Sequence, residues 1–129
     1  MAQFISALTL VVPDYDEGID FYVRKLGFVL HEDTQLSPEK RWVTIAPKGA
    51  KETKILLAKA SNDDQKTAIG NQTGGRVGFF LQTDQFDQDY AHMKENGVTF
   101  LEEPRDEVYA KVVVWQDPFG NKWDMLQPK

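Results

Sequence analysis

The sequence repeats its own landmarks at a spacing of 70 residues, and this repeat limits the folds open to the chain. Asp14 and Asp84 each follow an apolar run, and thirteen residues after each aspartate comes a glycine, Gly27 or Gly97. The two halves share few identical residues, but both have the same order of apolar run, aspartate and glycine. The chain is therefore predicted to use one structural unit twice.

The residues between each aspartate and its glycine follow the pattern of an amphipathic helix. Asp14 is a favourable N-cap, Glu17 completes a capping-box pattern, and Asp84 repeats the N-cap position in the second half. Gly27 and Gly97 suit the left-handed residue that often follows a helix. The apolar stripes comprise Ile19, Tyr22, Val23 and Leu26 in the first helix and Phe86, Tyr90 and Met93 in the second.

One strand-like run precedes each helix and three follow it. The runs are 3–12, 28–33, 41–46 and 53–59 in the first half, and 76–83, 98–101, 109–116 and 122–127 in the second. The repeated unit is therefore βαβββ, which predicts an α+β fold of two mixed sheets curved around a cleft.

We expect a single domain over residues 1–129, with module one at 1–60, a connecting loop at 61–74 and module two at 75–129. The loop is expected because its residues are polar and rich in glycine. One helix covers only one face of each sheet, so the other face must meet something else.

The composition excludes several classes of function. The chain has no cysteine, which excludes disulfides, thiolate metal sites and cysteine catalysis. Its two histidines, His31 and His92, limit any histidine-rich metal site within one chain. Its net charge of −5 argues against a nucleic-acid partner. The apolar run Phe4–Val12 is too short to span a bilayer and lacks the flanks of a signal peptide. We expect a cytoplasmic protein without membrane partners.

Strand alternation assigns side chains to the cleft or to the helix-covered core. Leu8, Leu10 and Val12 are expected to face the helix, and Trp115 and Trp123 to lie in the core.

Six residues are candidates for binding a ligand: Trp42, Arg76, Phe80, Tyr109, Asp124 and His31. Trp42 could stack on a flat or cationic ligand, and Asp124 could pair with Arg76 or bind a polar group. Tyr109 follows segment 104–107, which we expect to be a loop closing one end of the cleft. The structural alternatives are a core or interface role for Trp42, a backbone or arginine contact for Asp124, and a solvent-exposed strand end for His31.

The motifs of the repeat resemble the vicinal-oxygen-chelate superfamily, which includes glyoxalase I, extradiol dioxygenases, and fosfomycin and bleomycin resistance proteins. They are Val12-Pro-Asp14 through Phe21-Tyr22, Leu26-Gly27-Phe28, and the closing segment Asp117-Pro-Phe-Gly-Asn-Lys-Trp-Asp124. The resemblance covers nearly the whole chain and implies paired βαβββ modules, usually in homodimers. It leaves the function open, because this fold hosts isomerases, oxygenases, transferases and non-catalytic drug binders.

Catalytic members of this superfamily usually hold a divalent metal in the cleft through His and Glu side chains. The corresponding positions in this chain fall on Ala7, Leu56, Gly78 and Asp124, and only Asp124 is a plausible ligand. A selective transition-metal site normally needs three protein ligands. We therefore expect neither the usual metal nor another cofactor. A divalent metal would need Asp124, His31 and groups from a partner subunit.

The leading hypothesis is a glyoxalase/bleomycin-resistance-type protein that binds a small organic molecule in its cleft without a metal. The alternative is a metal-dependent glyoxalase-like lyase or isomerase, or a dioxygenase-type enzyme, acting on a small oxygenated substrate. A third hypothesis has Phe80, Leu56 and Trp42 filling the cleft of an interaction module. Whether the chain is an enzyme is left open.

Overall fold

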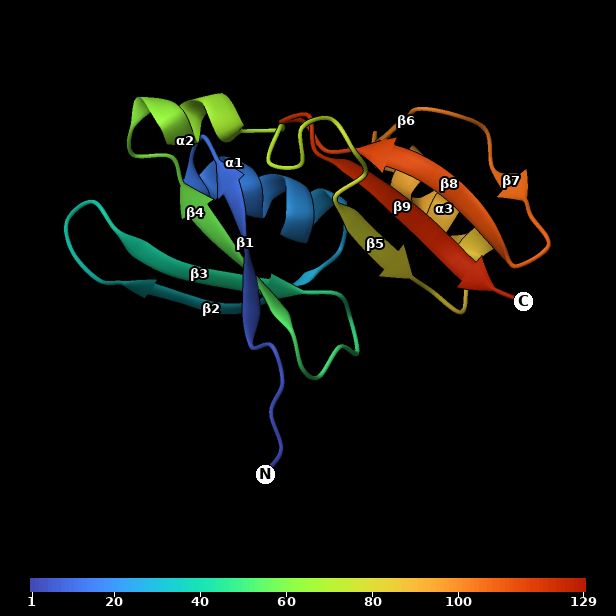
Figure 1. Ribbon diagram of the computed structural model, residues 1–129, viewed down its shortest axis with the longest axis horizontal. Coiled ribbons are helices and arrows are strands. Elements are labelled where there is room, and N and C mark those ends of the chain that lie inside the picture. Colours follow the sequence, from blue (N-terminus) through green and yellow to red (C-terminus); the bar gives the residue numbers. More distant parts are fainter. The chain divides into compact units, whose positions relative to one another are not determined.

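The structure, a computed structural model, describes residues 1–129 and divides into two compact units. Unit 1 comprises residues 1–69 and unit 2 comprises residues 70–129. Each unit has its own sheet and its own helices (Figure 1). No helix in either unit combines the length and the apolar character needed to cross a membrane.

Unit 1 is a four-stranded mixed sheet in the order β1-β4-β3-β2. Strands β1 and β4 are parallel and the other neighbours are antiparallel. Its elements are β1 (Ala7–Val12), α1 (Tyr15–Ile19), the π-helical segment η1 (Asp20–Lys25), β2 (Val29–Gln35), β3 (Arg41–Ala46), β4 (Lys54–Lys59) and α2 (Asp63–Ala68).

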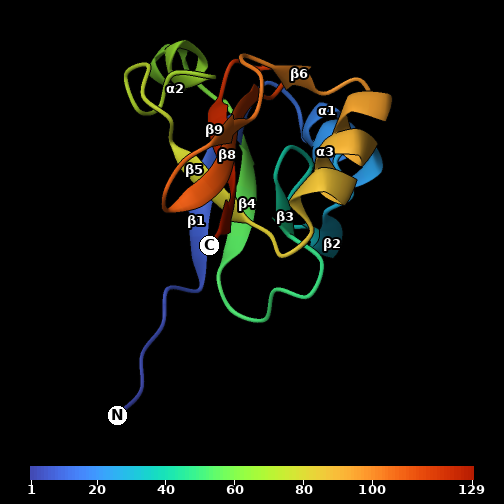
Figure 2. The same ribbon diagram turned by 90° about the vertical axis from the view of Figure 1, so that its right-hand side faces the viewer.

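Unit 2 repeats this plan, with the sheet order β5-β9-β8-β6 and a short strand, β7, that also pairs with β8. Its elements are β5 (Phe79–Gln82), α3 (Phe86–Glu95), β6 (Thr99–Phe100), β7 (Arg105–Asp106), β8 (Ala110–Gln116) and β9 (Lys122–Pro128). Helix α3 lies on one side of β8 and β9 (Figure 2). The α+β fold class predicted from the repeat is confirmed.

The core of unit 1 lies between the sheet and the helical segment α1–η1. Leu8 was predicted to belong to this core, but it is 53% exposed. The helix packs near the other end of β1, where Gly18 lies against Val12 and Leu57, so it does not reach Leu8. The fully or almost fully buried side chains are Leu10, Val12, Tyr22, Val43, Ile45 and Leu57.

The first helix departs from the regular period in its second half. In η1 the Leu26 N–H donates to the Phe21 carbonyl, five residues back, at 2.8 Å. This π geometry widens the turn. Phe21 is buried while Val23, a member of the predicted apolar stripe, is only partly buried.

The core of unit 2 is built on stacked aromatic rings. The rings of Trp115 and Trp123 lie 4.9 Å apart between centroids, and Phe79 stacks on Trp123 at 4.8 Å. Both tryptophans are almost completely buried, as the strand alternation predicts. Phe86 and Met93 are the buried side chains of α3.

The prediction that Asp14 is an N-cap is confirmed, whereas the prediction that Asp84 is one is wrong. The Asp14 carboxylate accepts hydrogen bonds from the N–H groups of Asp16 and Glu17 at 3.0 and 3.2 Å. Helix α3 begins later, at Phe86, and the Thr83 hydroxyl accepts the Gln85 N–H at 2.9 Å.

The segment 61–74, predicted as a connecting loop, contains helix α2 and the boundary between the units after Ile69. Asn62 caps α2 by accepting the Gln65 N–H at 2.9 Å. None of the six helical residues is buried, so this helix carries no apolar stripe that the sequence could reveal.

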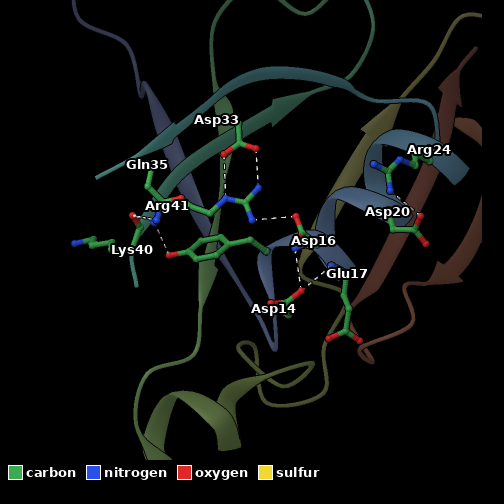
Figure 3. Close-up of polar contacts among 10 residues, drawn as sticks. Asp14, Asp16, Glu17, Asp20, Arg24, Asp33, Gln35, Lys40 and Arg41 are labelled. Carbon is green, nitrogen blue, oxygen red and sulfur yellow. Dashed lines mark hydrogen bonds and ion pairs between the residues drawn. The ribbon is translucent and has the colours of Figure 1, made fainter. Parts of the chain in front are cut away.

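An arginine connects three elements of unit 1. The Arg41 guanidinium donates two hydrogen bonds to Asp33 of β2, at 3.1 and 2.7 Å, and one to Asp16 of α1 at 2.9 Å (Figure 3). It also lies over the Tyr15 ring, 5.2 Å from the centroid, and the Tyr15 hydroxyl accepts the Arg41 N–H. The hydrogen bonds from Arg41 lower the pKa of the Asp33 carboxyl below its ordinary value.

We predict that Arg41→Ala lowers the free energy of unfolding by about 1–3 kcal/mol, because it removes charge-assisted hydrogen bonds to a partly buried carboxylate. Arg24→Ala is the control, since its pair with Asp20 is largely exposed, and we expect a loss below about 0.5 kcal/mol. Chemical denaturation measures both. Equal losses in the two variants would contradict the special role of Arg41.

The Arg41 network also gives the stability a pH dependence. Because the folded-state pKa of Asp33 is lowered, its contribution is present above its unfolded-state pKa and is lost as the pH falls through the folded-state value. Denaturation from pH 7 to pH 2 should show this loss in the wild type. In Arg41→Ala, the free energy of unfolding should decrease less steeply over the same fall in pH.

A close backbone approach occurs between Gly70 and the turn 117–121 within unit 2. A Cβ atom on Gly70 would lie 2.0 Å from the carbonyl oxygen of Phe119, whereas one on Gly74 would meet nothing within 4 Å. Both glycines have positive φ angles, 71° and 69°. Asp117 holds the turn by accepting N–H groups from Phe119 and Asn121 at 2.9 and 2.8 Å.

We predict that Gly70→Ala destabilises the protein by at least about 2 kcal/mol more than Gly74→Ala. In both variants the alanine must adopt a left-handed backbone conformation, which costs about 1–2 kcal/mol. Only the alanine at position 70 must also displace the turn 117–121. Thermal unfolding of the two variants measures the difference. Equal stabilities of the two variants would show that the turn 117–121 moves away from Gly70 without an energetic cost.

Candidate functional site

The sheet face of unit 2 opposite α3, called here the distal face of unit 2, is organised around Asp124. The strand register pairs Asp124 on β9 with Phe80 on β5 and with Val114 on β8. Lys122 and Leu126 lie two residues away on the same strand and share this face. Asp124 is thus a single carboxylate in the middle of a largely apolar row.

The Asp124 carboxylate is incompletely satisfied. Its Oδ1 atom is buried and has no hydrogen-bond partner. Burial raises the pKa of this carboxyl above its ordinary value; the positive charge of Arg105 opposes the rise and the negative charge of Glu102 adds to it. An unpartnered buried carboxylate oxygen is unfavourable unless a ligand, water or proton satisfies it.

Two charged residues, Arg105 and Glu102, act on Asp124, and both belong to a network that also includes Glu107. The Arg105 Nε donates to both Glu102 oxygens at 3.1 and 3.0 Å, and its Nη1 donates to Glu107 at 2.9 Å. Glu102 also accepts the Val114 N–H at 3.0 Å. Both carboxylates therefore engage the guanidinium, and the group including Asp124 has an excess of negative charge.

The predicted pairing of Asp124 with Arg76 is not what the structure shows. Arg76 is exposed and precedes the start of β5, four positions before Phe80, the residue paired with Asp124. The arginine that acts on Asp124 is Arg105.

Segment 104–107 was predicted to be a loop, but its residues Arg105 and Asp106 form β7 and pair with Val112 and Lys111 of β8. This pairing brings Arg105 to the distal face. Tyr109 lies in the turn between β7 and β8 and is 64% exposed. Phe80, at 67% exposed, presents a large aromatic surface next to Asp124.

The corresponding distal face of unit 1, opposite α1–η1, carries Trp42 and His31. Trp42 on β3 is 38% exposed, although Val43, Thr44 and Ile45 beside it are buried. His31 is the extra residue of a bulge in β2, and its Nδ1 lies 3.0 Å from the Thr44 hydroxyl. Trp42 and His31 thus belong to one face of one sheet.

The donor set does not fit the divalent metal that the fold implies. Ala7 and Leu56 have no ligand atoms in their side chains, and Gly78 has no side chain. A Cβ on Gly78 would lie 2.8 Å from the Thr73 methyl group, so that position is already occupied. Asp124 alone offers a single carboxylate, where a transition metal normally needs three protein ligands.

We predict that Asp124→Asn raises the free energy of unfolding at pH 7. The raised folded-state pKa means that the folded protein binds a proton more tightly than the unfolded chain, so stability falls as the pH rises from the unfolded to the folded value. The gain in the variant should shrink as the pH falls from the folded-state pKa towards the unfolded-state value of about 4, and it should be absent below that value.

Asp106→Asn should lower the free energy of unfolding at pH 7, the opposite of the effect of Asp124→Asn, because the hydrogen bond with Lys129 lowers the pKa of the Asp106 carboxyl. Chemical denaturation at pH 4 and pH 7 measures both variants. Destabilisation by Asp124→Asn at pH 7 would mean that the carboxylate has a stabilising partner.

Comparison with known proteins places this architecture in a family. The model of the Glyoxalase/Bleomycin resistance protein/Dioxygenase superfamily matches residues 4–125. A protein of Shewanella frigidimarina (strain NCIMB 400), named only "Uncharacterized protein", is 50% identical over 128 residues, which are 98% of this chain and 95% of that protein.

Solved structures agree with this match. TnmS3, an antibiotic binding protein from Streptomyces sp. CB03234, is 29% identical with a TM-score of 0.78, covering 99% of this chain and 98% of its own. A superfamily member from Sphaerobacter thermophilus DSM 20745 is 30% identical with a TM-score of 0.78, covering 98% of both chains. The chain therefore belongs to the Glyoxalase/Bleomycin resistance protein/Dioxygenase superfamily.

Proposed function

We propose that this protein binds a small organic cation on the distal face of unit 2, without the metal of the catalytic superfamily members. The observation that carries the proposal is the buried, unpartnered Oδ1 of Asp124. The Asp124 side chain as a whole is only partly buried. A ligand ammonium or amidinium group would supply a compensating positive charge there and, once the carboxylate rotates towards it, the missing hydrogen-bond donor.

The surroundings of Asp124 favour a cation with an apolar or aromatic body. Glu102 and Glu107 both lie on the Arg105 guanidinium, so Arg105 has little capacity left to neutralise Asp124. Phe80 is exposed beside the carboxylate and can contact an aromatic ring or a cation through its ring face. The similarity to TnmS3, an antibiotic binding protein, supports binding of a small molecule.

The metal-dependent enzyme is the weaker candidate, because three of the four expected ligand positions have no donor atom. The homodimer and the cytoplasmic location predicted from the sequence remain predictions. The proposed role is binding, as in sequestration of a toxic compound, and it requires no chemical step.

We predict that Asp124→Asn weakens binding of an organic cation by about tenfold or more, because it removes a charge-assisted hydrogen bond. Calorimetric titration with bleomycin and with ethidium, at pH 7 and moderate salt, measures the affinity. Binding to the wild type should weaken as the pH is lowered, since protonation of Asp124 removes its charge.

Asp106→Asn is the matched control, because it removes the same unit of charge from an exposed pair with Lys129 in unit 2. A purely long-range attraction to the acidic protein would weaken equally in both variants. Equal affinities in wild type and Asp124→Asn, or no binding of either cation, would overturn the proposed function.

A further inference from the structure

Unit 1 offers a second surface, whose residues differ from those around Asp124. It lies on the distal face of unit 1, where the strand register places Thr9, Leu56, Thr44 and Glu32 in one row across the sheet. The side chains of β1 and β4 on this face are mostly small. They are Ala7, Thr9, Val11, Leu56 and Ala58, with Lys54 at the edge.

Trp42 is the large aromatic side chain of this face. It is 38% exposed, whereas Trp115 and Trp123 are 0% and 3% exposed. Leaving an indole in water forgoes the free energy of burying its apolar area. The exposed part of the Trp42 indole is therefore accessible to a ligand on this side of unit 1.

His31 adds a directional polar group to the same face. The strand register passes from Leu30 opposite Ile45 to Glu32 opposite Thr44, so His31 is the residue inserted by the bulge. Bulges re-aim side chains and are common beside functional sites. The contact of Nδ1 with the buried Thr44 hydroxyl, at 3.0 Å, fixes the ring and directs the other nitrogen, Nε2, away from Thr44.

The charged groups nearby have partners of their own. The Glu32 carboxylate accepts the Thr34 hydroxyl at 2.9 Å, and the Lys54 ammonium donates to the Glu52 carbonyl at 2.7 Å. The face therefore combines an aromatic surface with one positioned hydrogen-bonding nitrogen, without a strong bias towards an ionic ligand.

We propose that the distal face of unit 1 binds a planar aromatic ring that carries a hydroxyl or carbonyl group. The ring stacks on Trp42, and the oxygen hydrogen-bonds to His31 Nε2. His31 is a specificity-determining residue, because it distinguishes oxygenated rings from plain hydrocarbons. This inference rests on the proposed small-molecule binding function, but it concerns different residues and a different part of the ligand.

The test uses two neutral probes that differ by one hydroxyl, 2-naphthol and naphthalene. The chain has three tryptophans, so proton–nitrogen NMR spectra contain three indole signals, and Trp42→Phe assigns that of Trp42. Both probes should shift the Trp42 signal in a saturable way and leave the signals of Trp115 and Trp123 in place. We expect 2-naphthol to bind about three- to tenfold more tightly, the contribution of one hydrogen bond.

His31→Ala should abolish the preference for 2-naphthol while leaving naphthalene binding unchanged. His92→Ala, which removes the other histidine from the exposed surface of α3, should preserve the preference. A Trp42 signal that neither probe moves, or a preference retained in His31→Ala, would overturn the proposal.

The result is distinguishable from a failure of the proposed function. The naphthyl probes carry no positive charge and do not need Asp124. Cation binding that depends on Asp124, without any effect of the naphthyl probes on Trp42, would refute this inference alone. The reverse result would refute the cation site and leave the aromatic face in place.

Discussion

In each unit a single helical segment, α1–η1 or α3, buries side chains against a sheet of four or more strands, and this ratio governs the rest of the structure. A single short helix covers only one face of such a sheet. The core side chains accordingly concentrate on the face towards α1–η1 in unit 1, and α3 contributes Phe86 and Met93 to the core of unit 2. The opposite faces are left to carry side chains whose chemistry is not required for folding, and the candidate ligand-binding residues Trp42, Phe80 and Asp124 lie there.

The fold could be predicted from local signals because those signals are repeated. Asp14 caps its helix, and Gly27 and Gly97 adopt the positive φ angles, 92° and 82°, that their positions after a helix suggest. Strand alternation alone predicted the core positions of Trp115 and Trp123, although it did not predict that their rings stack. Errors occurred where the signal was weak or was replaced by another residue. Helix α3 has Gln85 and not Asp84 at its N-cap, and its first N–H, that of Phe86, donates to the distant Gln127 side chain at 2.8 Å. Helix α2 has no buried residue that could reveal it.

The candidate site was less predictable, because its electrostatics depend on contacts between strands distant in sequence. Asp124 was recognisable from its position in the closing motif, but the arginine expected beside it was Arg76, and the one that acts on it is Arg105. Arg105 reaches the distal face because β7 pairs with β8, and a two-residue strand after Pro104 gives no periodic signal. Glu102 lies in the acidic segment 102–107, a composition that by itself indicates only a solvated loop. Its role in accepting the Val114 N–H, between the short strands β6 and β7, follows only from the register.

The distribution of the three tryptophans has a spectroscopic consequence. Trp115 and Trp123 stack at 4.9 Å in unit 2, close enough for their electronic transitions to couple, whereas Trp42 stands alone on the other unit. Near-ultraviolet circular dichroism is therefore dominated by the packing of unit 2. Quenching of fluorescence by a water-soluble agent reports instead on Trp42 and unit 1. The chain thus contains separate optical reporters for its two halves, and loss of structure in one half can be followed without labels while the other remains folded.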